Sequence, residues 1–295
     1  MNLELPARPP FSLATAVHSH GWVQLAPFGE DRAAGVLHCV IHLDSGRVVA
    51  LEVREGGPGV QVSPDTTLTG DEAAEVGRTV TWMLGLDQDF TDFYALAGDE
   101  PKLAAMEAQA QGRILRSPTL FEDTVKTILT TNTAWSGTIR MVRRLVDTYG
   151  APLPTDPDRK AFPRPERLAA VDPEELRRAA GLGYRAPYVA ELAGAVAGGS
   201  LDMEALRETD LPTPELRKQL LSIKGVGDYA AANLLMLLGR YDFLPVDSWA
   251  LRVVSHEWHG GEPIGRSEVE EAFQAWGPWR GLAYWFWDWS YNSAS

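Results

Sequence analysis

The stretch that decides the fold reads LLSIKGVGDYAAAN over residues 220–233 and continues as LPVDSW over residues 244–249. Gly225 and Gly227 flank one apolar residue between two helical patterns. Such glycines are typical of a tight hairpin whose backbone must approach another molecule closely. Asp247 follows Gly227 by twenty residues and stands where the next helical pattern begins. Together the two parts indicate a site that binds a phosphate backbone and places a carboxylate beside it.

The predicted hairpin offers a phosphate site that needs no side-chain charge. Backbone amides at the turn, with the unpaired amides and positive dipole end of the helix starting near Asp228, attract an anion without reading a base. An ordinary helix–helix turn has the same Gly-x-Gly pattern, and Asp247 alone fits a simple helix cap. The hairpin followed by the aspartate at this spacing is more specific than either part.

Composition indicates a folded protein with a large core and one to three domains. Apolar residues are 45% of the 295, and ten are tryptophan. The one cysteine, Cys39, excludes a disulfide framework or a cysteine-ligated cluster within one chain. We therefore expect no cofactor and no metal. Without a signal peptide or an apolar span in the sequence, we expect a cytoplasmic monomer, nucleoid-associated in a prokaryote, with no membrane partner.

The charge of the chain limits how it can hold nucleic acid. A net charge of −13 argues against binding by bulk electrostatics, so any such contact must be local. Positive residues nevertheless cluster in the middle of the chain, although solvated helix faces would look the same. The cluster comprises Arg113, Arg116, Lys126, Arg140, Arg143 and Arg144, followed by Arg177, Arg178 and Arg185.

The pattern along the chain predicts an α+β fold. Residues 35–43 and 47–53 are rich in β-branched side chains, and a turn sequence between them indicates an antiparallel hairpin. Helical patterns follow, one over 71–84 capped by Thr69 or Asp71 and one opened by Pro118 with Ser117 as its cap. We predict an N-terminal antiparallel sheet domain with flanking helices over 1–100. It packs on a mostly α-helical body over 101–295, which has two helical subdomains.

These residues resemble the helix-hairpin-helix and glycine/proline-aspartate superfamily of DNA glycosylases. The resemblance covers nearly the whole chain and is nearest to the 8-oxoguanine and bacterial 3-methyladenine glycosylase II branches. Three further stretches carry it: residues 121–132, residues 181–189 and the tryptophan, proline and arginine pattern of residues 276–283. The strand-rich N-terminus is similar to the additional antiparallel domain of both branches.

The resemblance implies base excision repair of double-stranded DNA that contains a damaged base. The damaged nucleotide is flipped out of the duplex, because its glycosidic bond is inaccessible inside the stack. Asp247 takes the position of the essential aspartate. Asn132 matches the residue that fills the gap, Tyr184 matches the wedge, and Arg185 matches the contact to the orphaned base. The remaining predicted DNA contacts are Lys224, Gly225, Val226, Gly227 and Ser248.

One departure from the family pattern bears on the reaction. Tyr229 stands where the bifunctional 8-oxoguanine branch has its lysine nucleophile, and a phenol cannot form a Schiff base. We therefore expect a monofunctional glycosylase, with an aromatic pocket that favours alkylated, cationic purines. The alternatives are a bifunctional 8-oxoguanine glycosylase/lyase and a non-catalytic binder of damaged DNA. The predicted base pocket comprises Tyr229, Asn233, Trp249, Tyr284 and Asp288.

Overall fold

The computed structural model describes residues 2–287 and groups them in two compact units. The first unit contains the residues up to Asp89, Arg113–Thr209 and Ile223–Gly225. The second contains Phe90–Gly112, Asp210–Ser222 and the residues from Val226 onward. Residue 100 lies inside a segment of the second unit, and the domain division predicted there stays a prediction.

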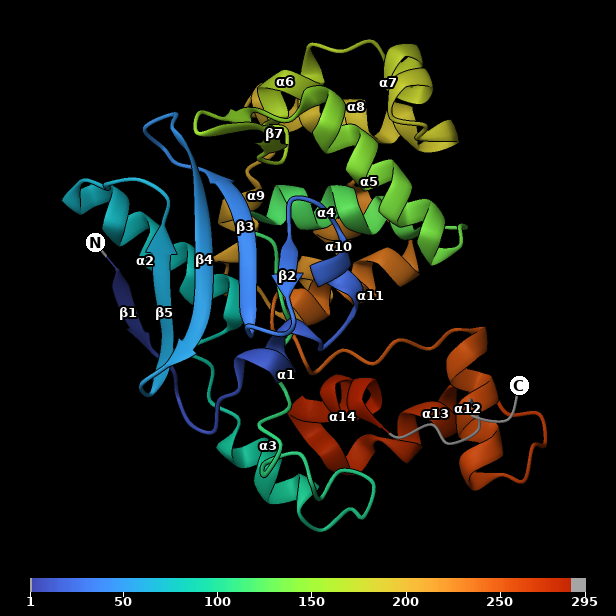
Figure 1. Cartoon of the computed structure of the whole chain (residues 1–295). Coiled ribbons are helices and arrows are strands. Elements are labelled where there is room, and N and C mark those ends of the chain that lie inside the picture. Colours follow the sequence, from blue (N-terminus) through green and yellow to red (C-terminus); the bar gives the residue numbers. More distant parts are fainter. Residues whose placement is uncertain (1, 288–295) are drawn as a thin grey trace. The chain divides into compact units, whose positions relative to one another are not determined.

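The first unit contains a five-stranded antiparallel sheet in the order β1-β5-β4-β3-β2 (Figure 1). The predicted hairpin is its centre, where Cys39 pairs with Leu51 and Gly46 adopts a positive φ of 85° in the turn. A separate two-stranded hairpin, β6–β7, packs Leu153 against the sheet. The strands are β1 (Leu3–Pro6), β2 (Gly29–Asp31), β3 (Val36–His42), β4 (Val48–Gly56), β5 (Gly59–Pro64), β6 (Pro152–Leu153) and β7 (Asp156–Lys160).

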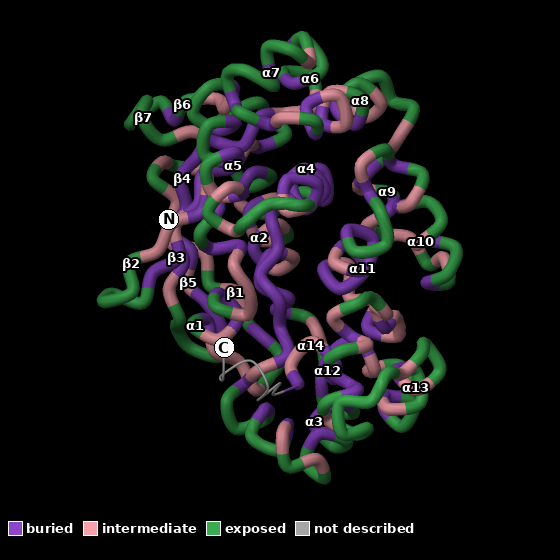
Figure 2. The backbone as a smooth tube through the Cα atoms, turned by 90° about the vertical axis from the view of Figure 1, so that its right-hand side faces the viewer, coloured by how far each residue is buried: buried purple, intermediate pink, exposed green. Residues whose placement is uncertain are grey.

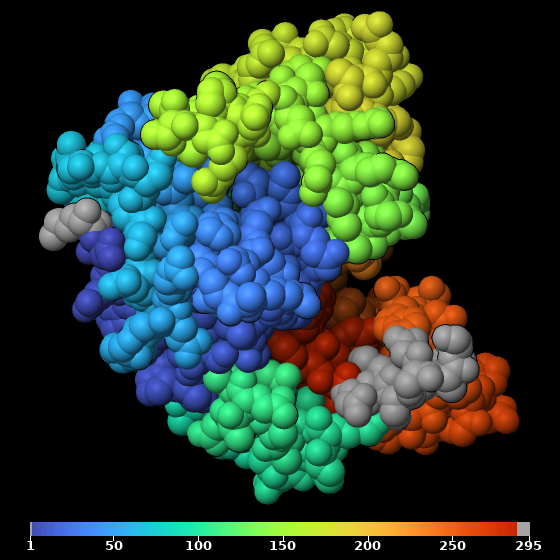
Figure 3. Space-filling model, viewed as in Figure 1, coloured from blue at the N-terminus to red at the C-terminus, as the bar shows by residue number. Residues whose placement is uncertain are grey.

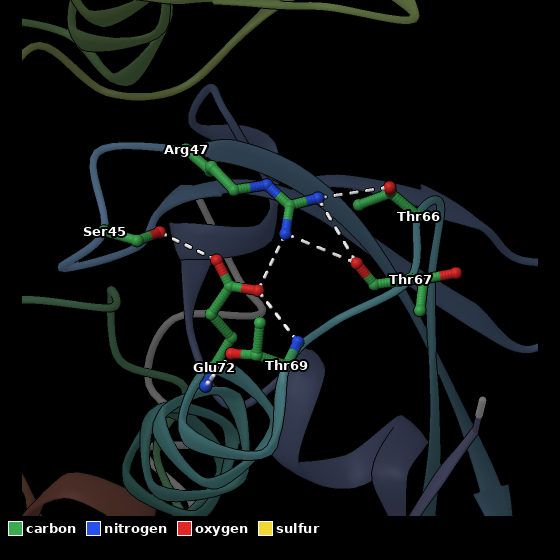
Figure 4. Close-up of polar contacts among 6 residues, drawn as sticks. All are labelled: Ser45, Arg47, Thr66, Thr67, Thr69 and Glu72. Atoms are coloured by element: carbon green, nitrogen blue, oxygen red, sulfur yellow. Dashed lines mark hydrogen bonds and ion pairs between the residues drawn. The ribbon is translucent and has the colours of Figure 1, made fainter.

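Two carboxylates of helix α2 (Gly70–Leu84) bond the turn between β3 and β4: Glu75 accepts from the Asp44 backbone N–H at 2.8 Å, and Glu72 makes the larger set of contacts. Glu72 accepts hydrogen bonds from Ser45 Oγ at 2.8 Å and from Arg47 Nη1 at 2.7 Å, as Figure 4 shows. Glu72 also accepts from the backbone N–H of Thr69, which is the N-cap and completes a capping box. The hydrogen bond from the Thr69 backbone is the largest cause that lowers the pKa of Glu72. The choice between Thr69 and Asp71 as cap is thereby decided for Thr69.

Helix α4 (Leu120–Thr130) is buried over nearly its whole length (Figure 2). Its N-cap is Thr119, whose hydroxyl accepts from the Glu122 backbone N–H at 3.2 Å. The predicted cap, Ser117, was therefore wrong: it lies before the helix and its hydroxyl accepts from Lys126 Nζ at 3.1 Å. The other helices of this unit are α1 (Leu13–Val17), η1 (Gly21–Gln24), α5 (Trp135–Tyr149), α6 (Pro165–Ala169), α7 (Pro173–Ala179), η2 (Gly183–Arg185), α8 (Ala186–Ala197) and α9 (Met203–Arg207).

Three charged side chains of α4 lie in the core of the first unit. Lys126 forms an ion pair with Glu122 at 2.6 Å, and the two side chains are 0% and 4% exposed. Asp123 accepts from Trp22 Nε1 at 2.7 Å and from the Ser117 backbone N–H at 2.9 Å. Burial raises the pKa of both carboxyl groups, against the opposing effect of Lys126. The charges are kept in the core because hydrogen bonds and an opposite charge replace their hydration.

The second unit is helical and contains an aromatic core. Trp279 stacks on Tyr241 with ring centroids 5.7 Å apart, and Phe90 and Phe93 pack on the same indole. Its helices are α3 (Thr91–Ala97), α10 (Thr213–Ser222), α11 (Asp228–Leu237), α12 (Ser248–Trp258), α13 (Arg266–Ala272), η3 (Gln274–Trp279) and α14 (Arg280–Phe286). The α+β class is confirmed, with the five-stranded sheet near the N-terminus and the two short strands β6 and β7 among the helices that follow. Within residues 2–287 no helix is long and apolar enough to cross a membrane.

Replacing Lys126 with methionine tests the buried ion pair. We expect a loss of about 3–5 kcal/mol in stability, because the Glu122 carboxylate is left buried without its partner. The matched double variant Glu122→Gln with Lys126→Met removes both charges and should regain most of that loss. Urea unfolding followed by circular dichroism measures both variants beside the wild type. A single variant as stable as the wild type would contradict the role given to this pair.

Candidate functional site

The predicted hairpin lies between α10 and α11, and its two glycines have different reasons to be glycine. Gly225 has a φ of +90°, and a Cβ there would lie 2.7 Å from the ring of Tyr188 in α8. Gly227 is the N-cap of α11 with a φ of −93°, and a Cβ there would meet nothing within 4 Å. Between them Val226 is buried. Gly225 therefore packs the loop on α8, and Gly227 leaves the start of α11 open.

No side chain caps the amides at the start of α11. These amides and the dipole of a ten-residue helix suit an anion such as a phosphate. Lys224 on the same loop forms an ion pair with Glu191 at 2.8 Å, and both side chains are 56% exposed. The hydrogen bond to Glu191 raises the pKa of Lys224, so the amine is held in its charged form.

The three residues predicted to fill a duplex lie together in the first unit. Asn132 follows α4 with a φ of +46°, and its Nδ2 donates to Tyr184 Oη at 3.2 Å. Tyr184 is 46% exposed and packs edge-on against Tyr188 at 6.2 Å between ring centroids. A hydrogen bond with Thr131 lowers the pKa of Tyr184. An exposed amide and an exposed aromatic ring are suited to base edges and base faces respectively.

Arg185 is mostly buried and contacts the segment that contains Asn132. It is only 6% exposed, its Nε donates to the Thr131 carbonyl at 3.1 Å, and one Nη donates to the Asn132 carbonyl at 3.2 Å. Its guanidinium also lies over the Tyr184 ring at 4.4 Å. Its Nε and one Nη are thus held by backbone carbonyls, and the contact with an orphaned base stays a prediction. Arg185 instead holds the backbone of Asn132 and the ring of Tyr184 in position.

The predicted catalytic aspartate lies at the start of α12 in the second unit. Asp247 is the exposed N-cap, and its Oδ1 accepts from the Ala250 backbone N–H at 2.8 Å. Tyr284 of α14 is buried, and its pKa is raised by burial and by the negative charge of Asp247. Ser248 is exposed at the first position of the helix. Asp247 thus acts as a cap while its carboxylate remains accessible to solvent.

The predicted base-pocket residues are distributed over three helices of the second unit. Tyr229 is 54% exposed in the first turn of α11, and Asn233 donates from Nδ2 to the Tyr229 carbonyl at 2.9 Å. Trp249 is half-buried, and Arg252 lies over its ring at 5.0 Å. Tyr284 is the buried member, and Asp288 lies outside the described residues.

The cluster of positive residues predicted from the sequence is only partly on the surface. Arg113, Arg116 and Lys126 are between 0% and 3% exposed, which was not foreseen. Arg113 donates to four backbone carbonyls in the first unit, so it is a structural cross-link there. The three arginines of α5 are exposed. Among residues 2–287 there is no group of three or more His, Cys, Asp or Glu that could hold a metal ion.

The C-terminal tryptophan, proline and arginine pattern contacts the backbone of residues 241–243. Gly281 donates its N–H to the Tyr241 carbonyl at 2.8 Å, and a Cβ there would lie 2.1 Å from the Phe243 carbonyl oxygen. Arg280 Nε donates to the Asp242 carbonyl. The pattern thus clamps residues 241–243, the segment that leads to Asp247. The sequence analysis did not identify the contact of Asp242 with Arg280 or the packing of Tyr188 against Tyr184. The spacing of four residues between Tyr184 and Tyr188 was a signal for the second contact.

The chain matches HhH-GPD, the superfamily of base excision DNA repair proteins, over residues 125–278, which is more than half its length. It belongs to that superfamily and is a DNA glycosylase. The predicted superfamily is thereby confirmed, and with it the expectation of an enzyme.

Individual relatives have low sequence identity, but the matched segments are long. A probable N-glycosylase/DNA lyase of Methanothermobacter thermautotrophicus is 27% identical over 225 residues, which are 67% of this chain and 69% of that protein. DNA-3-methyladenine glycosylase 2 of Escherichia coli is 28% identical over 166 residues, or 55% of each chain. The structure of a 3-methyladenine DNA glycosylase from Archaeoglobus fulgidus matches with a TM-score of 0.77 at 23% identity. That match covers 100% of this chain and 99% of the other.

The two hairpin glycines give a paired test. Gly225→Ala should destabilise the protein by about 1–3 kcal/mol, because it combines a strained φ with a clash against Tyr188. Gly227→Ala should cost less than about 1 kcal/mol, because only the preference for glycine over alanine at an N-cap is lost. Thermal unfolding of both variants measures the difference. Equal melting temperatures would contradict the packing role of Gly225.

Proposed function

We propose that the chain is a monofunctional DNA glycosylase that removes an alkylated purine from double-stranded DNA. The observation that carries the proposal is the accessible carboxylate of Asp247 at the N-terminus of α12, with one oxygen committed to the cap. Hairpin amides and the exposed Asn132 and Tyr184 supply the means to hold a duplex and fill its gap. Asp247 supplies the negative charge that the chemistry needs.

The proposed reaction is hydrolysis of the N-glycosidic bond. As that bond breaks, its electron pair leaves with the base and the sugar gains oxocarbenium-like positive charge. The Asp247 carboxylate stabilises this charge and accepts a proton from water, whose oxygen forms the new bond to the sugar.

Two features support hydrolysis without lyase chemistry. The position of a lyase lysine holds Tyr229, which has no amine. Lys224 is the nearest lysine in the sequence, and its ion pair with Glu191 raises its pKa and so disfavours the neutral amine that a Schiff base requires. The Methanothermobacter thermautotrophicus relative is named a probable N-glycosylase/DNA lyase, so a bifunctional enzyme is the alternative that the experiment must test.

Two observations favour an alkylated purine as the lesion. The Escherichia coli relative is named a 3-methyladenine glycosylase, and the exposed ring of Tyr229 is available to a cationic base. Trp249 is less suited to that task, because Arg252 lies over its ring. We propose an alkylated purine because of the named activity of the Escherichia coli relative and the exposed ring of Tyr229.

The reaction is tested with duplexes that each carry one lesion, scored with and without alkali. We expect strand breaks only after alkali, with 3-methyladenine or 7-methylguanine among the bases released. Breaks without alkali would overturn the monofunctional assignment in favour of the lyase. Selective binding of damaged duplexes with no base release from any of them would favour the non-catalytic alternative.

Asp247→Asn separates chemistry from folding, because asparagine caps a helix as well as aspartate does. We expect single-turnover base release to fall by about 100-fold or more, with DNA affinity and melting temperature retained. The matched control is Asp202→Asn, since Asp202 is an exposed N-cap that accepts from the Ala205 backbone N–H at 2.9 Å. The control should keep wild-type turnover. Near-normal turnover by Asp247→Asn would refute the assigned role.

A further inference from the structure

Three arginines form one exposed face of α5 in the first unit. Arg140, Arg143 and Arg144 have the spacing i, i+3 and i+4, which places them on the same side of a helix. All three are exposed, and the helix lies at the surface in Figure 3, drawn in green. We call these three residues the basic face.

The basic face has no acidic partner. Within residues 2–287, none of the three arginines forms an ion pair or a cation–π contact. Other surface arginines do, as in the pairs of Arg8 with Asp89 at 2.7 Å and of Arg54 with Glu52 at 3.0 Å. Three unpaired positive charges within about one helical turn repel one another. In a chain of net charge −13 such a group is suited to an anion from outside.

The basic face continues a surface that already contains the hairpin loop and the duplex-filling residues. Gly225 packs on Tyr188, whose ring lies against Tyr184, and Tyr184 bonds Asn132. Asn132 is followed within three residues by the start of α5. At the other side, a Cβ on Gly181 would lie 3.1 Å from Arg144 Nη1, so this guanidinium borders the loop that bears Tyr184. All these contacts belong to the first unit.

We propose that the basic face binds the phosphate backbone of duplex DNA beyond the nucleotides that Asn132 and Tyr184 contact. The inference rests on the proposed function, since it assigns a second contact to the same substrate. Hairpin amides bind phosphate through dipoles, whereas arginines bind it as full charges that release counterions. The basic face therefore contributes to the salt dependence of binding.

The test uses the double variant Arg140→Ala with Arg144→Ala and undamaged duplex over a range of salt concentrations. We expect weaker binding and a slope of log K against log salt that is smaller by about 1 for each arginine. The matched control is Arg54→Ala with Arg78→Ala, which removes a half-buried arginine from β4 and an exposed one from α2 and should leave the slope unchanged. Equal slopes for the wild type and the Arg140 and Arg144 variant would overturn the proposal.

Two further arms separate charge from folding and from the reaction. Arg140→Lys with Arg144→Lys should keep the wild-type slope, because the charge is retained; a loss as large as with alanine would overturn a phosphate contact. Trimming the duplex on the side that reaches α5 should weaken wild-type binding and not that of the alanine variant. If wild-type protein released no base from any lesion, the proposed function would fail, while the salt slopes would still decide whether the basic face binds DNA.

Discussion

The ion pair between Lys126 and Glu122 is the buried charge interaction around which the core of the first unit is packed. Both side chains are removed from water, and the neighbouring Asp123 bonds Trp22 near the N-terminus and the backbone of Ser117. Removing one partner of such a pair leaves an uncompensated buried charge, which is strongly destabilising. The sheet side of the unit, α4 and the segment before α4 are therefore fixed together. Asn132 is placed by this arrangement, because it follows the C-terminal end of the same helix.

The buried guanidinium of Arg185 supports two exposed residues, Asn132 and Tyr184. Arg185 is directed inward to the carbonyls of Thr131 and Asn132, and its guanidinium supports the ring of Tyr184. An asparagine at positive φ is strained unless its surroundings hold it. Arg185 provides this support without occupying the surface. The exposed amide of Asn132 and the exposed ring of Tyr184 are thereby held in one arrangement.

Local features were predictable from the sequence, and burial was not. The β3–β4 hairpin, the hairpin before α11 and the N-cap position of Asp247 depend on neighbouring residues, so a single sequence predicts them. The positive cluster was misread because its members enter different environments: Arg113 and Lys126 are buried, and Arg140 is exposed. Only the tertiary arrangement distinguishes these environments. The family motif over residues 121–132 was recognised correctly, but that its charges lie in the core could not be seen in it.

The contact between Gly225 and Tyr188 links two positions that lie far apart in the chain. The hairpin loop has no room for a side chain because the aromatic ring of α8 occupies the space where one would begin. A smaller side chain at position 188 would make room for a Cβ at position 225, but it would also remove the ring that packs against Tyr184. The backbone of the hairpin loop and the placement of Tyr184 are thus coupled through one aromatic ring.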